Sequence, residues 1–169
     1  GFGGIGGNTT GISIVVVGYN ALDANTTGGE NTAVGNGALT SNTTASNNTA
    51  VGSNALLTNT TGTQNVAVGH DCMETNNATN NTAVGFESMK NNSTGASNTA
   101  VGNNALDANT TADGNTAVGN NALGANTTGN NNTAVGRSAL DANVTNVSNC
   151  AFGNSALTNS TSDYNNAFG

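Results

Sequence analysis

The chain has 169 residues, of which 34% are hydrophobic, 4% aromatic and only 7% charged, and its formal net charge is −7. An ordinary domain of this length carries about a quarter charged residues and many large apolar side chains. One histidine, two basic residues and nine scattered acids argue against a conventional enzyme, so we expect no catalytic, cofactor-binding or metal-binding residues.

The shortage of cations also bears on the partners of the protein. Binding to nucleic acid or to anionic lipid requires several Lys and Arg side chains on one face, and the chain has two such residues in all. No apolar run approaches the ~20 residues that span a membrane. We therefore expect no nucleic-acid partner and no membrane insertion in this segment.

The first residues differ from the rest of the chain. Gly1–Gly7 is rich in glycine, and no charged-then-apolar leader is present, so we expect a processed chain or a fragment. An apolar run, Ile12–Val17, follows. Because the open end of a repeat array exposes strand edges, residues 1–13 are predicted to form an N-terminal cap or a junction with a preceding subunit.

Residues 14–169 form one internal repeat. A glycine ends each short apolar run, and successive glycines are 17 residues apart seven times and 16 residues apart twice. One unit consists of Asn31–Gly35, two variable residues, Ala38–Leu39, and then Asn42–Thr44 with a polar connection. The two short copies lose a residue in a connection, one between Asn76 and Asn81 and the other between Gly153 and Asn159. A fixed period of this length indicates a solenoid.

The composition of the unit decides which kind of solenoid forms. Thr, Val, Asn and Gly are poor helix formers, and the apolar positions lack the i, i+3, i+4, i+7 spacing of a helix. Thr-Ala-Val is predicted to be one strand, Gly the bend, Ala-Leu with its flanks a second strand, and Asn-Thr-Thr a turn or a third strand. The fold class is thus all-β, a parallel β-solenoid of about ten coils.

Stacked coils place equivalent residues in columns along the rod. The Val and Leu columns are predicted to form the core, flanked by two columns of Asn side chains that hydrogen-bond between coils. The predicted core residues are Val34, Val51, Val68, Val84, Val101, Val118, Val135, Leu22, Leu39, Leu56, Leu106, Leu123, Leu140 and Leu157.

The Ala columns follow from the alternation of side chains along a strand. If Val fills the core, the neighbouring Ala faces outward. The burial of one Val and one Leu per coil does not offset the conformational entropy lost when 17 residues are ordered, so further burial between chains is expected. The predicted inter-chain stripe is Ala33, Ala50, Ala67, Ala83, Ala100, Ala117 and Ala134. The expected partner is the chain itself, as a trimer or a head-to-tail filament.

The unit Asn-Thr-Ala-Val-Gly-x-x-Ala-Leu resembles the head repeats of YadA-like trimeric autotransporter adhesins, and related repeats occur in phage tail-fibre proteins. The resemblance covers about Ile14 to Gly169 and is carried by nine to ten repetitions. It implies a parallel β-roll, three chains side by side, an extracellular position on a cell or virion surface, and attachment to a host-surface glycan or protein. The unit here is longer than the usual one, and no stalk heptads follow.

Several individual residues suggest a metal site, a disulfide or a modification, but each suggestion has less support than the repeat. His70 lies near Asp71 and Cys72, but no second histidine or paired cysteine completes a metal site. An acidic column after Leu is interrupted too often for a calcium roll. Cys72 and Cys150 lie more than four coils apart, too far for a disulfide within one rod. Possible glycosylation sites are the sequon residues Asn25, Asn42, Asn59, Asn109 and Asn126, although Asn-Thr-Thr also has a purely structural reading as a turn.

Three functions remain open at this stage. The first is an extracellular structural or adhesive fibre built by self-assembly. The second is an ice-binding solenoid, because repeated pairs such as Thr26–Thr27 form a regular hydroxyl array. The third is a glycan-binding tail-fibre shaft that uses the polar variable pairs.

Overall fold

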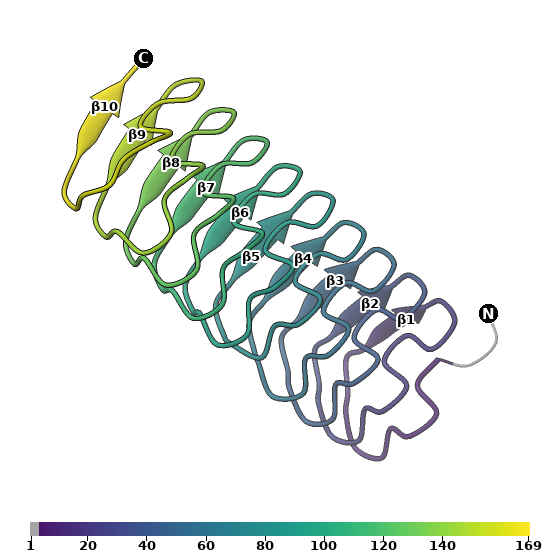
Figure 1. Cartoon of the computed structure of the whole chain (residues 1–169). Helices are drawn as coiled ribbons and strands as arrows, with labels where there is room; N and C mark the ends of the chain where they lie inside the picture. The colour runs from purple at the N-terminus through teal and green to yellow at the C-terminus, as the bar shows by residue number, and fades with distance from the viewer. Residues whose placement is uncertain (1–3) are drawn as a thin grey trace.

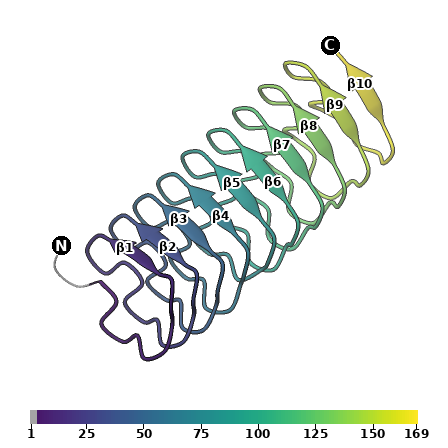
Figure 2. The same cartoon turned by 180° about the vertical axis from the view of Figure 1, so that it is seen from behind.

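The computed structural model describes residues 4–169 as a single rod of stacked coils, with the two ends of the chain at opposite ends of the rod (Figure 1; Figure 2, from behind). Ten three-residue strands pair in chain order in one parallel sheet, with no helix among the described residues. Their bounds are β1 Val15–Val17, β2 Thr32–Val34, β3 Thr49–Val51, β4 Val66–Val68, β5 Thr82–Val84, β6 Thr99–Val101, β7 Thr116–Val118, β8 Thr133–Val135, β9 Cys150–Phe152 and β10 Asn166–Phe168. The predicted all-β parallel solenoid is confirmed.

Each coil contains one strand. Strand register never slips, so Thr32 pairs with Thr49 and Ala33 with Ala50, and the pairing continues through both 16-residue coils. The predicted second strand at Ala-Leu is wrong, because these residues lie in a tight turn. In that turn Asn54 and Leu56 both have left-handed backbone, with φ of +57° and +52°. An L residue pays about 1 kcal/mol or more for that conformation, which the burial of leucine offsets.

The predicted phase of the strand is also wrong. The Ala column is the buried one: Ala33, Ala50, Ala67, Ala83, Ala100, Ala117 and Ala134 are all 0% exposed inside a single chain. They cannot form an inter-chain stripe. The Val column faces outward, and none of Val34, Val51, Val68, Val84, Val101, Val118 and Val135 belongs to the buried core.

The reason is the narrow cross-section of the coil. The predicted Leu column is buried from Leu22 to Leu140, with Leu157 partly buried, and it packs in one cluster with the Ala residues of the strands. The turn also buries Ala38 and its equivalents. A long side chain from the turn leaves room for only a methyl group on the strand, so Val points away from the core.

Glycine is required where the strand bends. Gly102 has a φ of +142°, which L residues rarely adopt. A Cβ at this position would lie 2.5 Å from the carbonyl oxygen of Gly119 in the next coil. The bends therefore stack backbone on backbone, which explains why this glycine recurs in every unit.

Both Asn columns are buried and hydrogen-bonded, as predicted. In the first, one coil's amide donates to the amide oxygen of the coil before it, as Asn42 Nδ2 does to Asn25 Oδ1 at 2.8 Å. In the second, an Asn side chain accepts from the next coil's backbone, as Asn31 Oδ1 does from the Asn48 N–H at 3.0 Å. We call these the amide ladder and the backbone ladder.

The N-terminal segment joins the rod within its described part. Ile5 donates its N–H to Ala21 O at 3.2 Å, and Asn8 Oδ1 accepts from Asn25 Nδ2 at 2.9 Å, repeating the contacts of later coils. Residues 1–3 of the expected cap or junction lie outside the described residues.

Candidate functional site: the outward strand face

The outward strand face has two columns, because the first and third residues of every strand point away from the core. The first column is mostly Thr: Val15, Thr32, Thr49, Val66, Thr82, Thr99, Thr116, Thr133, Cys150 and Asn166. The second is mostly Val: Val17, Val34, Val51, Val68, Val84, Val101, Val118, Val135, Phe152 and Phe168. Neither column contains a charged residue, so the face is a continuous uncharged band along the rod.

This face carries most of the large apolar side chains that remain exposed among the described residues. Val84 and Val101 are each 37% exposed, and Phe168 is 78% exposed. Phe152 and Phe168 stack with ring centroids 5.3 Å apart. Elsewhere the surface is mostly Asn, Thr and Gly, and its exposed large apolar or aromatic side chains are Ile12, Tyr19, Phe86, Val144 and Tyr164. A row of apolar side chains that continues along one face is typical of an interaction site.

The hydroxyl groups of the Thr pairs are not equivalent. The first Thr of a pair bonds to the next coil, as Thr26 Oγ1 does to Thr43 O at 3.0 Å, while Thr27 is exposed. In such a pair, one hydroxyl group of the expected array is therefore hydrogen-bonded within the rod, and the other faces solvent. On the strand face, by contrast, the Thr32 hydroxyl has no partner among the described residues.

The five predicted glycosylation residues belong to the amide ladder. Asn25, Asn42, Asn59, Asn109 and Asn126 are each 0% exposed. Each Nδ2 donates both to the neighbouring coil and to a carbonyl three residues ahead, as Asn109 does to Asn92 Oδ1 at 2.7 Å and to Ala112 O at 3.1 Å. A glycan on this nitrogen would displace the ladder, so glycosylation at these positions is a wrong prediction for the folded rod.

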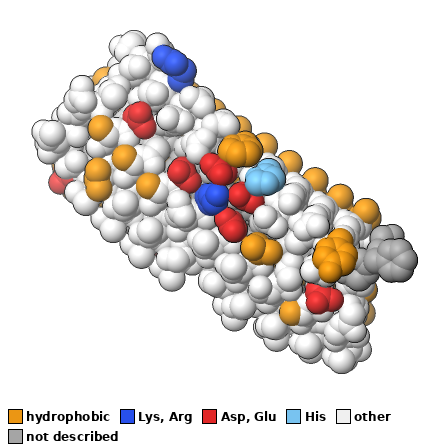
Figure 3. All heavy atoms as spheres, turned by 45° about the vertical axis from the view of Figure 1, so that its right-hand side comes forward, with side chains coloured by type: hydrophobic (Ala, Val, Ile, Leu, Met, Phe, Trp, Pro, Cys, Tyr) orange, Lys and Arg blue, Asp and Glu red, His pale blue; other side chains and the backbone are white. Residues whose placement is uncertain are grey.

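Charged side chains gather on another face, in the middle of the rod (Figure 3). Lys90 Nζ lies 2.9 Å from Glu87 Oε1, 3.1 Å from Asp71 Oδ2 and 3.7 Å from Glu74 Oε2. These hydrogen bonds to Glu87 and Asp71 raise the pKa of Lys90 above its ordinary value. Sequence analysis did not predict this network, because its members come from consecutive coils and share no motif.

The same network affects the pKa values of the carboxyl groups in and beside it. Burial raises the pKa of Asp71, but hydrogen bonds from Asn54 and Lys90 outweigh burial and hold the pKa below its ordinary value of 3.8. Burial and the nearby Glu87 raise the pKa of Asp107. Lys90 pairs with carboxylates of its own coil and of the coil before it, so the ion pairs link two adjacent coils at the surface.

His70 lies at the edge of this network. Its ring stacks on Phe86 with centroids 5.4 Å apart, and its Nδ1 lies 3.4 Å from Asp71 Oδ1. Within residues 4–169, no group of three His, Cys, Asp or Glu side chains could hold a metal ion. The histidine ring is therefore stacked on Phe86 and lies beside the Asp71 carboxylate.

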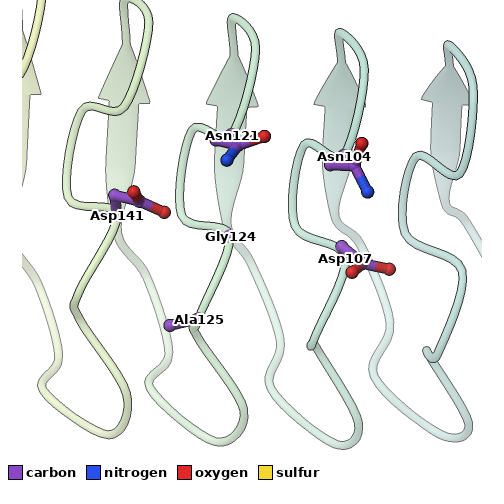
Figure 4. Close-up of a pocket in the computed structure, with 6 residues that line it drawn as sticks. All are labelled: Asn104, Asp107, Asn121, Gly124, Ala125 and Asp141. Atoms are coloured by element: carbon purple, nitrogen blue, oxygen red, sulfur yellow. The ribbon is translucent and has the colours of Figure 1, made fainter.

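A shallow polar groove of about 410 Å³ lies beside the charged network and is lined by Asn104, Asp107, Asn121, Gly124, Ala125 and Asp141 (Figure 4). It exists because Gly124 lacks a side chain in the column after Leu. The two carboxylates lean in the same direction along the rod, so that Asp141 leans toward Gly124 and Asp107 leans away from it (Figure 4). A calcium site would need carboxylates that converge on one point, and these two carboxylates do not converge.

The two cysteines are both free, as expected from their separation. Cys72 is buried in the turn column, where its Sγ lies 3.3 Å from Ala83 O, and burial raises the pKa of its thiol to about 12. Cys150 lies on the outward strand face in β9.

Comparison of the chain with protein-family models, with curated proteins and with solved structures gives no match. In the part of the chain that the structure describes, no helix is long and apolar enough to cross a membrane.

Proposed function

We propose that the chain is part of an extracellular fibre protein, used for structure or attachment on a cell or virion surface, whose rods associate side by side through the outward strand face. The observation that carries this proposal is the uncharged Thr and Val band along the rod. Burying apolar surface yields about 25 cal/mol per Å². The resemblance to trimeric adhesin and tail-fibre repeats points to the same kind of assembly.

In this proposal the Val column forms the contact between chains, in place of the Ala column that was predicted from the sequence. The Ala residues close the core of a single rod, and the turn contributes Leu to that core. The Val side chains remain half-exposed, with Val101 37% exposed in the isolated rod. Packing a second and third rod on this band would bury those side chains at no cost in buried charge, because the band has none.

The test is the mass of the native particle. The triple variant Val68→Lys, Val101→Lys, Val135→Lys places three charges on the band. The matched control, Thr44→Lys, Thr94→Lys, Thr128→Lys, places three charges on an exposed corner column. Light scattering should give an assembled wild type, a dissociated band variant and an assembled control. A dispersed wild-type monomer, or equal behaviour of the two variants, would refute the proposal.

One observation favours a second function, ice binding. The outward Thr column presents hydroxyl groups at a repeat of about 4.8 Å along the rod, next to Val methyl groups. In this reading the rod stays monomeric and the same band orders water. Thermal hysteresis in purified monomer, abolished by Thr99→Lys and kept in Thr94→Lys, would support it. Absence of hysteresis would exclude it.

A further inference from the structure

The two 16-residue coils each lack one residue at the same corner, which lies between the amide ladder and the backbone ladder. The first runs from Asn76 to Asn81, where a 17-residue coil has one residue more between the two ladders. In the last coil, Ser160 takes the position of the amide ladder, because its N–H donates to Leu157 O at 3.1 Å as Asn143 N–H does to Leu140 O at 3.0 Å. The second deletion therefore lies between Ser160 and Asn165, which corrects the position expected from the sequence.

The same rearranged hydrogen bonds occur at both shortened corners. In the first, Asn81 Nδ2 donates across the corner to Asn76 Oδ1 at 3.2 Å, and Asn76 Nδ2 donates to Ala78 O at 3.1 Å. In the second, Asn165 Nδ2 donates to Ser160 Oγ at 3.0 Å. Ser160 Oγ in turn donates to Ser162 O at 3.3 Å, again two residues ahead.

These new bonds are made at the expense of the amide ladder. In a 17-residue coil the Asn side chain reaches the amide oxygen of the coil before it, as Asn109 does to Asn92. At the first shortened corner Asn76 Nδ2 donates to Ala78 O and not to Asn59 Oδ1, and at the second the ladder position is held by Ser160, which has no amide group. Asn59 Oδ1 and Asn143 Oδ1, one coil before each shortened corner, are buried acceptors without a partner among the described residues.

Backbone contacts change at the first shortened corner as well. At several other corners an N–H donates to the next coil's carbonyl, as Thr110 does to Thr127 O at 3.1 Å. At the shortened corner the Thr60 N–H donates instead to the side chain of Asn77, to Oδ1 at 2.7 Å. Asn77 is exposed, so this contact is open to water.

We propose that these two steps, between Asn59 and Asn76 and between Asn143 and Ser160, are built-in weak points at which the rod opens first under heat or load. A solenoid is held by nearest-neighbour contacts, so its local stability follows the weakest step. The sheet itself is continuous across both steps. Opening therefore begins at the ladder corner while the strands stay paired. This inference concerns the single rod and does not depend on the proposed assembly.

Amide hydrogen exchange followed by mass spectrometry tests the proposal. In wild-type protein, corner amides of residues 76–81 should exchange about tenfold faster than those of the complete corner Asn42–Asn48, which has no buried side-chain N or O atom without a partner among the described residues. The reason is that an unpartnered buried acceptor costs about one hydrogen bond or more. The decisive variant inserts one Thr after Asn77. The corner then reads Asn-Asn-Thr-Ala-Thr-Asn-Asn, which matches the complete corner Asn42–Asn48.

The insertion should slow exchange at this corner to the rate of the complete corners and raise the melting temperature. The matched control inserts the same Thr after Thr111, where the corner is already complete, and should lower the melting temperature. Deleting Thr111, in a corner that belongs to neither step, should create a third fast-exchanging corner. Equal exchange of short and complete corners in wild type, or destabilisation by the Asn77 insertion as large as in the control, would overturn the proposal.

Discussion

Removing one rung of the amide ladder should show how much buried asparagine stabilises the rod. Asn109 is 0% exposed, and it donates to Asn92 Oδ1 at 2.7 Å and to Ala112 O at 3.1 Å, while its own oxygen accepts from Asn126 at 3.3 Å. Asn109→Ala deletes all three bonds. At a net ~1 kcal/mol for each bond, the free energy of unfolding should fall by about 3 kcal/mol.

The assay is urea denaturation, in which the midpoint should fall while the slope with urea stays unchanged. Asn120→Ala is the control, because Asn120 is exposed and its bond to the Asn103 side chain is 3.3 Å long. Such a surface change should alter stability by no more than about 0.5 kcal/mol. If the two variants unfold at the same urea concentration, the ladder does not stabilise the rod and the reasoning is refuted.

Three further results are expected. Gly102→Ala should lower the melting temperature strongly, because its Cβ would meet the Gly119 carbonyl oxygen at 2.5 Å. Gly124→Ala would meet the flexible Asp141 side chain at 2.9 Å and the Asn121 carbonyl oxygen at 3.3 Å, so it should lower the melting temperature much less in the same assay. Lys90→Met removes a bond that lowers the pKa of Asp71, so the melting temperature should drop at pH 7 and the difference from wild type should fade as the pH falls below the ordinary pKa of 3.8. The Cys72 thiol, with its pKa raised to about 12, should be alkylated at pH 8 only after urea unfolds the rod, as measured by mass spectrometry; fast labelling of folded protein would contradict its burial.

The repeat made the architecture predictable. Columns depend only on the period, so the parallel register, the Leu core and both Asn ladders followed from spacing. The strand position was predictable for the same reason, since Thr-Ala-Val recurs in every coil. The position of the second deletion could not be predicted, because Asn159 looks like an amide-ladder residue in the sequence. In the structure it is Ser160 that occupies the ladder position.

The inward face of the strand could not be read from hydrophobicity alone. Alternation offers two solutions, either Val inside or Ala inside, and hydrophobicity favours the first. The second is realised because the turn brings Leu56 inward through left-handed backbone at φ +52°, a conformation that propensities assign to Gly and Asn. Once Leu occupies the narrow interior, the strand can contribute only a methyl group.

That inversion changes what the surface can do. A rod with Val inside would present Ala and polar groups outward. Neighbouring rods could then approach closely but would bury little apolar side-chain surface. With Ala inside, each coil closes its own core and still presents two uncharged side chains outward, which are a Thr and a Val in six of the ten strands. Thr and Val are also the β-branched residues that strands favour, so their recurrence on this face is compatible with the fold of one chain. Charge placed on Val101 separates the two uses, because it leaves the Ala and Leu core of the rod in place and changes only the outward face.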